Sequence, residues 1–167
     1  MSYTYEAAGV SVNWYGLNLS EGWGEDTFLT ITPNSERVRY KVGANGQYTF
    51  SKMADKGCTI SMTFTDVAPV NKKVGGLAGA QDLIGNALAI APFTVVDETG
   101  KSVHFICENA VLTEVSDIEF GAESGERTWT WVAETYIMAE DPATITAGLD
   151  RWIKASEAQE STEFVEL

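Results

Sequence analysis

The segment ERVRYKVGANGQYTFSKM, residues 36–53, contains two alternating runs on either side of a glycine-rich sequence. In the first run the apolar residues Val38, Tyr40 and Val42 alternate with basic residues. Successive side chains of a strand point to opposite faces, so this spacing predicts a strand with one apolar and one basic face. GANG, residues 43–46, is a turn sequence, and the whole segment therefore predicts a long antiparallel β-hairpin.

The same alternation recurs along most of the chain. In TISMTFT, residues 59–65, it places Ile60, Met62 and Phe64 on one face and hydroxyl side chains on the other. Further strands are predicted over residues 10–19, 26–32, 88–97, 102–120 and 127–138, with turns at 98–101 and 121–126. The run 102–120 is either one long strand or two strands broken near Asn109.

Helical spacing is confined to residues 74–88 and 143–155. The second stretch follows Asp141-Pro142, a helix-start signal, and places Leu149, Trp152 and Ile153 on one face with Ile145. The predicted fold is therefore mainly β: an antiparallel β-sandwich or barrel with one packed α-helix, a projecting β-hairpin and a further helix near the C-terminus. We expect residues 1–155 to form a single domain and residues 156–167 an acidic, mobile tail.

Charge is divided unevenly along the 167 residues. Residues 1–80 hold 7 Lys/Arg and 7 Asp/Glu, whereas residues 81–167 hold 4 and 17 and so carry the whole net charge of −13. The basic residues of the first half cluster within twenty positions, at Arg37, Arg39, Lys41, Lys52 and Lys56. Such a chain can attract copies of itself head to tail, although a merely solubilising acidic surface is the alternative. It is poorly suited to gripping nucleic acid, which needs many contacts from Lys and Arg to phosphate.

The N-terminal MSYTYEAAG lacks a basic and then apolar signal pattern, and no apolar run approaches the length that spans a bilayer. Two cysteines, Cys58 and Cys107, are too few for a disulfide framework and are expected to be buried free thiols. We therefore expect the chain to be made and folded in a cytoplasm.

No constellation for catalysis or metal binding emerges from the residues. His104 and Cys107 are three positions apart, which on a strand places them on opposite faces. GAESGE, residues 121–126, has the wrong spacing and setting for a nucleophilic serine. Carboxylates that interrupt the apolar runs recur along several strands, which is typical of a charged sheet face more than of a catalytic pair; they are Glu108, Glu114, Asp117, Glu119 and Glu134.

The glycine-rich segment KVGGLAGAQDLIGN, residues 73–86, resembles a dinucleotide-binding turn only superficially. Its spacing is G-G-x-x-G, with Val74 where the first glycine of the fingerprint belongs, and no P-loop lysine follows. We interpret the segment as a pliable joint that leads into the packed helix, and Asp97 as the end of a strand. The apolar residues after the glycines are expected to enter the core or the next strand; they are Leu83, Ile84, Leu88 and Ile90.

Three long stretches together have a family likeness: residues 13–52, 68–100 and 126–138. They begin NWYGLNLSEGWGEDTFLTITPNSERVRYKV, APVNKKVGGLAGAQDL and ERTWTWVAETYIM. Across roughly residues 5–142 the chain resembles the tail tube proteins of contractile-tailed bacteriophages, a group related in fold to the Hcp tube of type VI secretion.

The resemblance implies a structural virion protein and no enzyme. It implies hexameric rings that stack into a hollow tube, with DNA and the tape measure protein in the lumen and a contractile sheath protein outside. Baseplate and tail terminator proteins are the further implied partners, the location is the virion tail after assembly in the host cytoplasm, and no cofactor or catalytic residue is implied. DNA is expected to pass without specific binding, and no membrane anchor is implied.

The family resemblance suggests roles for two sets of charged residues. The five clustered basic residues (Arg37, Arg39, Lys41, Lys52 and Lys56) are expected to contact an acidic surface of the adjacent ring. Some of the five strand-interrupting carboxylates are expected to line the lumen, because a basic wall would bind phosphate and stall DNA. The acidic tail from Ser156 onward is expected to contact the sheath or a neighbouring subunit. The alternative function is a small-ligand-binding β-barrel module, with Trp129 and Trp131 lining its pocket.

Overall fold

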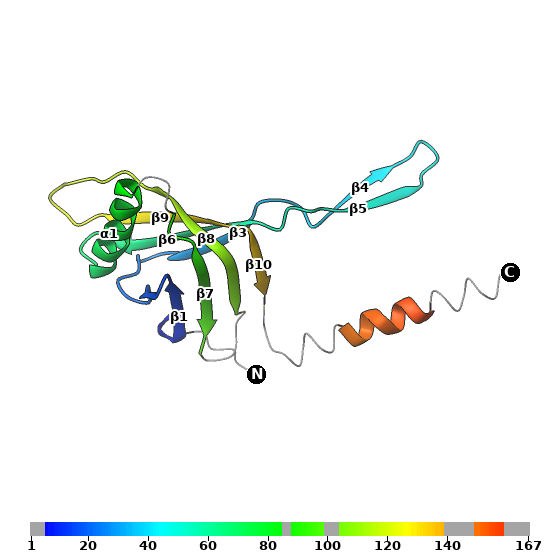
Figure 1. Ribbon diagram of the computed structural model, residues 1–167, viewed down its shortest axis with the longest axis horizontal. Coiled ribbons are helices and arrows are strands. Elements are labelled where there is room, and N and C mark those ends of the chain that lie inside the picture. The colour runs from blue at the N-terminus through cyan, green and yellow to red at the C-terminus, as the bar shows by residue number, and fades with distance from the viewer. Residues whose placement is uncertain (1–5, 85–87, 99–103, 139–148, 159–167) are drawn as a thin grey trace.

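The computed structural model describes residues 6–84, 88–98, 104–138 and 149–158 (Figure 1). A short 3-10 helix, η1 (Ala7–Gly9), precedes the first strand. The strands are β1 (Val10–Trp14), β2 (Leu17–Asn18), β3 (Leu29–Pro33), β4 (Val38–Val42), β5 (Tyr48–Lys52), β6 (Cys58–Thr65), β7 (Ala91–Asp97), β8 (Phe105–Val115), β9 (Glu126–Ala133) and β10 (Thr135–Met138). One α-helix, α1 (Pro69–Leu83), lies between β6 and β7, and residues 149–158 are also helical. The predicted mainly β, antiparallel class is confirmed.

Eight strands form one continuous antiparallel sheet in the order β2-β1-β7-β8-β9-β6-β3, with β10 also paired to β8. β8 is a single long strand whose first half pairs with β7 and β10 and whose second half pairs with β9. At its middle, Asn109 adopts a positive φ of 53° and donates a side-chain hydrogen bond to Glu134, at the junction of β9 and β10. Such irregularities bend a strand, and here the bend lies where the two halves of the sheet meet.

The bend brings the two halves of the sheet face to face over a core of aromatic rings. The Trp14 ring from β1 lies 5.6 Å from that of Trp131 on β9, and the Phe93 ring from β7 lies 5.2 Å from Trp131. The indole N–H of Trp14 donates to the Ala110 carbonyl of β8. Ring pairs at these separations add to the free energy of burial, so the two halves act as the layers of a sandwich.

β6 is the strand that the sequence describes best. Its residues alternate strictly between buried and half-buried, with Ile60, Met62 and Phe64 in the core as predicted. The predicted strand 10–19, in contrast, is two strands: β1 and β2 form a tight hairpin through Tyr15 and Gly16, both at positive φ. A two-residue turn of this kind requires positive φ at both central positions, and Tyr15 gave no signal of it.

Helix α1 begins at Pro69, five residues before the predicted start, and contains the glycines that we interpreted as a joint. Proline suits the first turn because its missing N–H has no partner there anyway. Val70 and Val74, four residues apart, are buried against the sheet. A side chain on Gly75 would meet the ring of Trp129 at 3.7 Å, so the helix lies close to the sheet at this point. The joint interpretation is therefore wrong.

The apolar residues after the glycines are not in the core. Leu83, Ile84, Leu88 and Ile90 are 88, 66, 57 and 50% exposed. The buried residues of α1 all lie in its first half, and beyond them Leu77 and Ala78 pack against the core only in part. The predicted core role of Leu83, Ile84, Leu88 and Ile90 is therefore wrong, but Leu88 and Ile90 come just before β7 and so lie at the entry to that strand. Asp97 ends β7 as expected.

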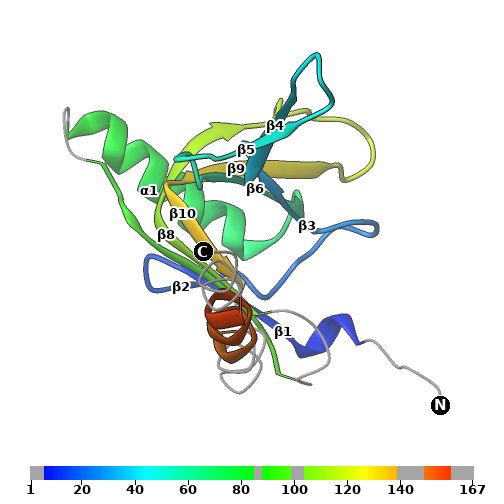
Figure 2. The ribbon, with the colours of Figure 1, turned by 90° about the vertical axis from the view of Figure 1, so that its right-hand side faces the viewer.

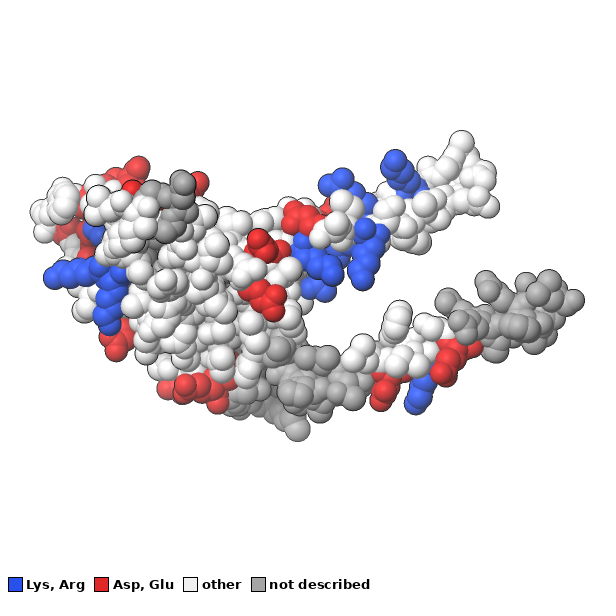
Figure 3. Space-filling view, viewed as in Figure 1, with Lys and Arg blue, Asp and Glu red and all other residues white. Residues whose placement is uncertain are grey.

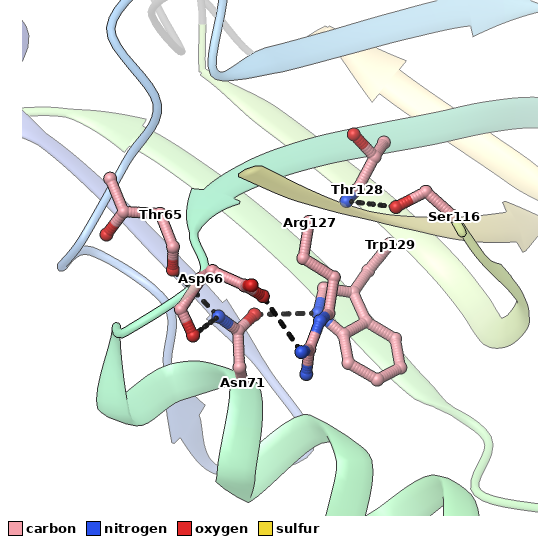
Figure 4. A network of polar contacts seen from close by, with 7 residues as sticks. All are labelled: Thr65, Asp66, Asn71, Ser116, Arg127, Thr128 and Trp129. Carbon is pink, nitrogen blue, oxygen red and sulfur yellow. Dashed lines mark hydrogen bonds and ion pairs between the residues drawn. The ribbon is translucent and has the colours of Figure 1, made fainter. Parts of the chain in front are cut away.

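A polar network fixes the start of α1 to the sheet (Figure 4). Asn71 is 3% exposed; its amide NH₂ donates to the carbonyls of Thr65 and Asp66, and its amide oxygen accepts from the indole N–H of Trp129 at 3.0 Å. Beside it, Arg127 and Asp66 form an ion pair of 2.8 Å. The Asn71 amide and the Trp129 indole N–H thus both have partners, as a folded interior requires, whereas the buried Nε of Arg127 has none.

The two cysteines meet in the core. Cys58 on β6 and Cys107 on β8 are fully buried free thiols with their sulfur atoms 3.6 Å apart, as the sequence predicted for their burial. Burial raises the pKa of the Cys107 thiol above its ordinary value, and the neighbouring Cys58 raises it further. Burial likewise raises the pKa of Cys58. Both sulfurs are therefore protonated and unreactive at neutral pH.

The predicted hairpin is present as a separate two-stranded sheet of β4 and β5 that extends away from the body (Figures 1 and 2). The helical residues 149–158 overlap the predicted 143–155 and run three residues into the predicted tail. Residues 99–101 of the predicted turn and 159–167 of the predicted tail lie outside the described residues.

Candidate assembly interface

The projecting hairpin has an exposed apolar face. The register pairs Tyr40 with Phe50 and Val42 with Tyr48, and paired residues share a face of the ribbon. The members of this face are half to two-thirds exposed: Val38, Tyr40, Val42, Tyr48 and Phe50. The Tyr48 ring stacks on Phe50 at 6.2 Å and lies 6.1 Å from Tyr40. Large contiguous apolar patches are uncommon on monomers and mark interaction sites, so this face is a candidate interface.

The opposite face of the hairpin is polar and basic, as predicted. Arg39 and Lys41 lie there with Ser51 and Thr49, their partners in the register. Arg39 has only a long, exposed ion pair of 3.7 Å to Glu36, which contributes little in water. In Figure 3 the blue side chains gather along the shaft of the hairpin and leave its tip uncharged.

The remaining predicted basic residues lie elsewhere on or near the hairpin. Lys52 pairs with Val38 and so lies on the apolar face. Arg37, at the base, already contacts another residue of the same chain. Its guanidinium lies 5.6 Å from the centre of the Tyr136 ring and donates a hydrogen bond of 3.3 Å to the Tyr136 hydroxyl. Lys56 follows the hairpin in the sequence and forms an isolated parallel β-bridge with Thr135. The five residues thus do not form a single surface.

The base of the hairpin is held to the body. A cleft of about 370 Å³ separates it from β10 and is lined by Arg37, Lys52 and Tyr136 among others. Beyond β5 the Asp55 carboxylate accepts hydrogen bonds from the Gly57 N–H and the Ser35 hydroxyl, and these lower the pKa of Asp55. The hairpin is therefore anchored at its base and free along its length.

The predicted lumen residues fall into three groups, and all five are exposed. Glu108 and Glu134 lie at the bend of the sheet, where Glu108 accepts from Thr135 and Glu134 from Asn109. Glu114 lies on the outer face of the sheet, opposite Thr130 of β9. Asp117 and Glu119 follow β8 in the loop 116–125.

The outer face around Glu114 is rich in hydroxyl groups. The register of β3, β6 and β9 places on it Thr30, Thr32, Thr59, Ser61, Thr63, Thr128, Thr130 and Val132. The hydroxyls of Thr63 and Thr128 are 3.0 Å apart, and Thr113 donates to the Thr130 carbonyl. None of these strand positions holds Lys or Arg, so these positions offer no cation to an anion.

The loop 116–125 lies at the end of the molecule opposite the hairpin (Figure 1). Phe120, at 93% exposed, and Ile118, at 52%, are apolar residues in this acidic loop. A hollow of about 320 Å³ lies beside this loop and is lined by Phe120 and Val67 among others. Val67 is 80% exposed. The predicted strand 102–120 therefore ends at Val115, and residues 116–120 belong to this loop, together with most of the predicted turn 121–126.

The ligand-pocket alternative loses the residues on which it depended. Trp129 is 5% exposed and Trp131 is fully buried, so both rings belong to the core and line no pocket. His104 directly precedes β8, and its ring nitrogen Nε2 lies 3.2 Å from the Asp97 carbonyl oxygen. Within the described part of the chain, no three His, Cys, Asp or Glu residues are grouped to hold a metal ion. Among the same residues, no helix has the length and apolarity needed to cross a membrane.

Comparison with solved structures gives the fold a context. A chain of the anti-feeding prophage cap, described as a tube terminating cap, has a TM-score of 0.58 at 15% identity; the match covers 82% of this chain and 91% of that one. A chain of the sheath/tube terminator of the extracellular contractile injection system PVC, in its extended state, has a TM-score of 0.58 at 14% identity. That match covers 82% of this chain and 97% of the other. A chain of the PVC sheath-tube complex in its extended state has a TM-score of 0.58 at 14% identity, and the match covers 81% of this chain and 91% of the other.

The chain shares the fold of these contractile-system structures. At this level of identity the likeness is one of architecture only. No protein-family model matches the sequence, and no curated protein matches it either. Any role must therefore be argued from the surfaces described above.

Proposed function

We propose that the chain is a structural subunit of a contractile tail, and that it self-assembles into hexameric rings stacked as the inner tube. The observation that carries this proposal is the free apolar face of the β4–β5 hairpin. Five large apolar side chains on a projecting arm are half to two-thirds exposed. Covering such a face with another surface is favourable in water, and large exposed apolar patches mark interaction sites.

A second copy of the chain is the simplest source of that surface. The hairpin is a separate two-stranded arm that projects from the body, and contact of an arm with a different surface of the next copy is heterologous. Heterologous contacts close into rings or continue as open stacks. Both arrangements are needed for a tube of stacked rings, and the fold likeness to tube terminators supports this setting.

The outer face of β3, β6 and β9 is our candidate for the channel wall. Its hydroxyl groups and Glu114 offer no cation to a phosphate backbone, and such contacts supply most non-specific affinity for DNA. A wall of this kind lets DNA pass without binding it. Glu108 and Glu134, at the bend, extend the same acidic character and are proposed to lie along the channel with Glu114.

The proposed partners follow from this placement. The sheath protein surrounds the tube, the tape measure protein occupies the lumen, and baseplate and terminator proteins close the two ends. The role is non-enzymatic, the location is the tail, and assembly takes place in the host cytoplasm. The acidic segment from Ser156 onward is proposed to contact the sheath or a neighbouring subunit.

A tube terminator is the second candidate, because two of the similar structures are described as a cap and a terminator. A terminator forms one ring and stops growth, whereas a tube subunit adds ring upon ring. The two roles thus predict different products from the same purified chain.

Negative-stain microscopy of the purified protein across a concentration series tests the proposal. We expect hollow tubes of stacked rings with sixfold end views. Single rings that never elongate would favour the terminator. Uniform small monomers at all concentrations would overturn both and favour a binding module instead.

A further inference from the structure

The end of the molecule remote from the hairpin carries its own exposed apolar group. Phe120 is the most exposed large apolar side chain among the described residues, and Ile118 lies two positions before it. The loop is tied down at both ends: the Thr128 N–H donates to the Ser116 hydroxyl, and the Asp66 N–H donates to the Gly125 carbonyl. Phe120 is therefore held away from the core on an anchored loop.

The same loop is acidic. Asp117, Glu119 and Glu123 fall within seven residues, and residues 116–126 contain no Lys or Arg. One basic residue, Arg127, lines the hollow beside the loop, and it is paired with Asp66 at 2.8 Å. The loop carboxylates thus face solvent without a neutralising partner in the loop itself.

The hairpin has the complementary character. It presents Tyr40, Phe50 and their neighbours on one face, and Arg39 and Lys41 on the other. An arm that is both apolar and basic matches an end that is both apolar and acidic. Figure 1 places the two at opposite ends of the longest axis, so one chain can give its hairpin and receive another at the same time.

We infer that the loop 116–125, together with Val67, is the surface that accepts the β4–β5 hairpin of a second copy. The inference rests on the proposed function, because it names the acceptor for the arm that carries it. Since donor and acceptor are different surfaces at opposite ends of the subunit, the contact is heterologous and repeats from copy to copy. Where the repeat does not close into a ring, it propagates a stack of subunits.

A competing acceptor is a groove of about 760 Å³ beside the base of the hairpin, with Leu88, Ile90 and Val132 in its lining. Its apolar residues are also exposed. However, its lining carries Lys56 as well as the carboxylates Asp55 and Glu134. Both carboxylates already accept hydrogen bonds, Asp55 from Ser35 and Gly57 and Glu134 from Asn109. Charge therefore favours the loop over the groove.

Charge inversion tests the assignment in the full-length chain. The hairpin variant Arg39→Glu/Lys41→Glu and the loop variant Glu119→Lys/Glu123→Lys are each expected to raise the critical concentration for assembly by about tenfold or more, since like charges then face each other. The fourfold variant that combines all these changes restores the opposite signs and is expected to return to within about threefold of the unaltered chain. Sedimentation of assembled protein across a concentration series gives the critical concentration.

The control places the compensating charge in the competing groove: Glu134→Lys combined with the hairpin variant is expected to give no rescue. Rescue by Glu134→Lys, or failure of the fourfold variant to recover while the unaltered chain still forms tubes, would overturn the acceptor assignment and leave the proposed function standing. An unaltered chain that stays monomeric would overturn both.

Cross-linking gives an independent readout, because Cys58 and Cys107 are buried and leave no exposed thiol among the described residues. Under mild oxidation with oxidised glutathione, Val42→Cys/Ala122→Cys is expected to yield a ladder of disulfide-linked oligomers. Val42→Cys/Ile90→Cys is expected to remain monomeric on a denaturing gel. The reverse pattern would assign the hairpin to the groove.

Discussion

Replacing Phe50 by alanine should weaken assembly without weakening the subunit. Phe50 lies on the apolar face of the hairpin and is 68% exposed. An aromatic side chain offers about 150–250 Å² for burial, so on the order of 100–170 Å² of Phe50 is still available to a partner. At about 25 cal/mol per Å², covering that area contributes roughly 2.5–4 kcal/mol. Alanine retains part of the area, which leaves an expected loss of about 2 kcal/mol for each contact.

A loss of this size is readily measured. Since about 1.4 kcal/mol corresponds to a tenfold change in an equilibrium constant, the critical concentration for tube formation should rise by roughly 30-fold. The free energy of unfolding of the unassembled subunit should stay unchanged, because Phe50 belongs to a two-stranded sheet that is separate from the core. Sedimentation measures the first quantity, and urea unfolding below the critical concentration measures the second.

Leu83→Ala is the matched control. Leu83 is an apolar side chain that is 88% exposed, and it lies at the end of α1, outside both the hairpin and the proposed acceptor. Its truncation should leave the critical concentration unchanged. Equal critical concentrations for the two variants, or a Phe50→Ala subunit that unfolds more easily, would refute the reasoning.

Three further predictions concern the body of the subunit. Asn71→Ala leaves the buried indole N–H of Trp129 without an acceptor and should lower the free energy of unfolding by about 2–4 kcal/mol in urea titrations. Gly22→Ala should cost about 2–4 kcal/mol in the same assay, because Gly22 has a φ of 71° and an added methyl would collide with Ala68. The free energy of unfolding should fall as pH rises above the ordinary thiol pKa of 9.0, because the folded state raises the pKa of Cys107 and holds its proton longer than the unfolded chain. Cys107→Ala should flatten that decline between pH 8 and pH 10.5, roughly the range over which an unfolded thiol ionises.

Each of these predictions has a control in the chain. Lys72→Ala, next to Asn71 but exposed, should change stability by less than about 0.5 kcal/mol. Gly16→Ala shares a positive φ but meets nothing within 4 Å, so it isolates the backbone cost of about 1 kcal/mol. A Gly22→Ala loss equal to that of Gly16→Ala would contradict the collision with Ala68. A Cys107→Ala chain with the same alkaline decline would assign the decline to other groups.

Much of the fold follows from periodicity alone. Residues 59–65 alternate so strictly that one face had to be core, and Ile60, Met62 and Phe64 are indeed buried. The hairpin of residues 36–53 was equally predictable, because the turn sequence GANG separates two alternating runs. These segments share a property: local spacing and tertiary packing favour the same structure.

Helix α1 was misplaced because its local preferences and its packing disagree. Gly75, Gly76 and Gly79 each weaken a helix by about 1 kcal/mol relative to alanine, so the sequence pointed to a joint. Docking of Val70 and Val74 on the sheet outweighs that cost, and the absence of a side chain at Gly75 permits close approach to Trp129. Tertiary contacts of this kind cannot be seen in a single segment.

The candidate interface was predicted only in part. Charge clustering identified the hairpin, but the apolar face of Tyr40 and Phe50 was indistinguishable from a core face until its exposure was known. The position of Lys52 on that face depends on the pairing of β4 with β5, a register that the turn length sets. Phe120 was missed because residues 116–120 were predicted to continue a strand that ends at Val115, and a lone aromatic residue carries no periodic signal of a loop.

The separation of the hairpin from the sheet also makes it a transferable part. β4 and β5 pair only with each other, and their base is attached through a few contacts such as that of Arg37 with Tyr136. Residues 38–52 can therefore be exchanged for a hairpin of different sequence while the core and the contact of Arg37 with Tyr136 are left intact. The proposed contact between this arm and its acceptor predicts that substitutions in the two surfaces keep the subunits of related devices from mixing.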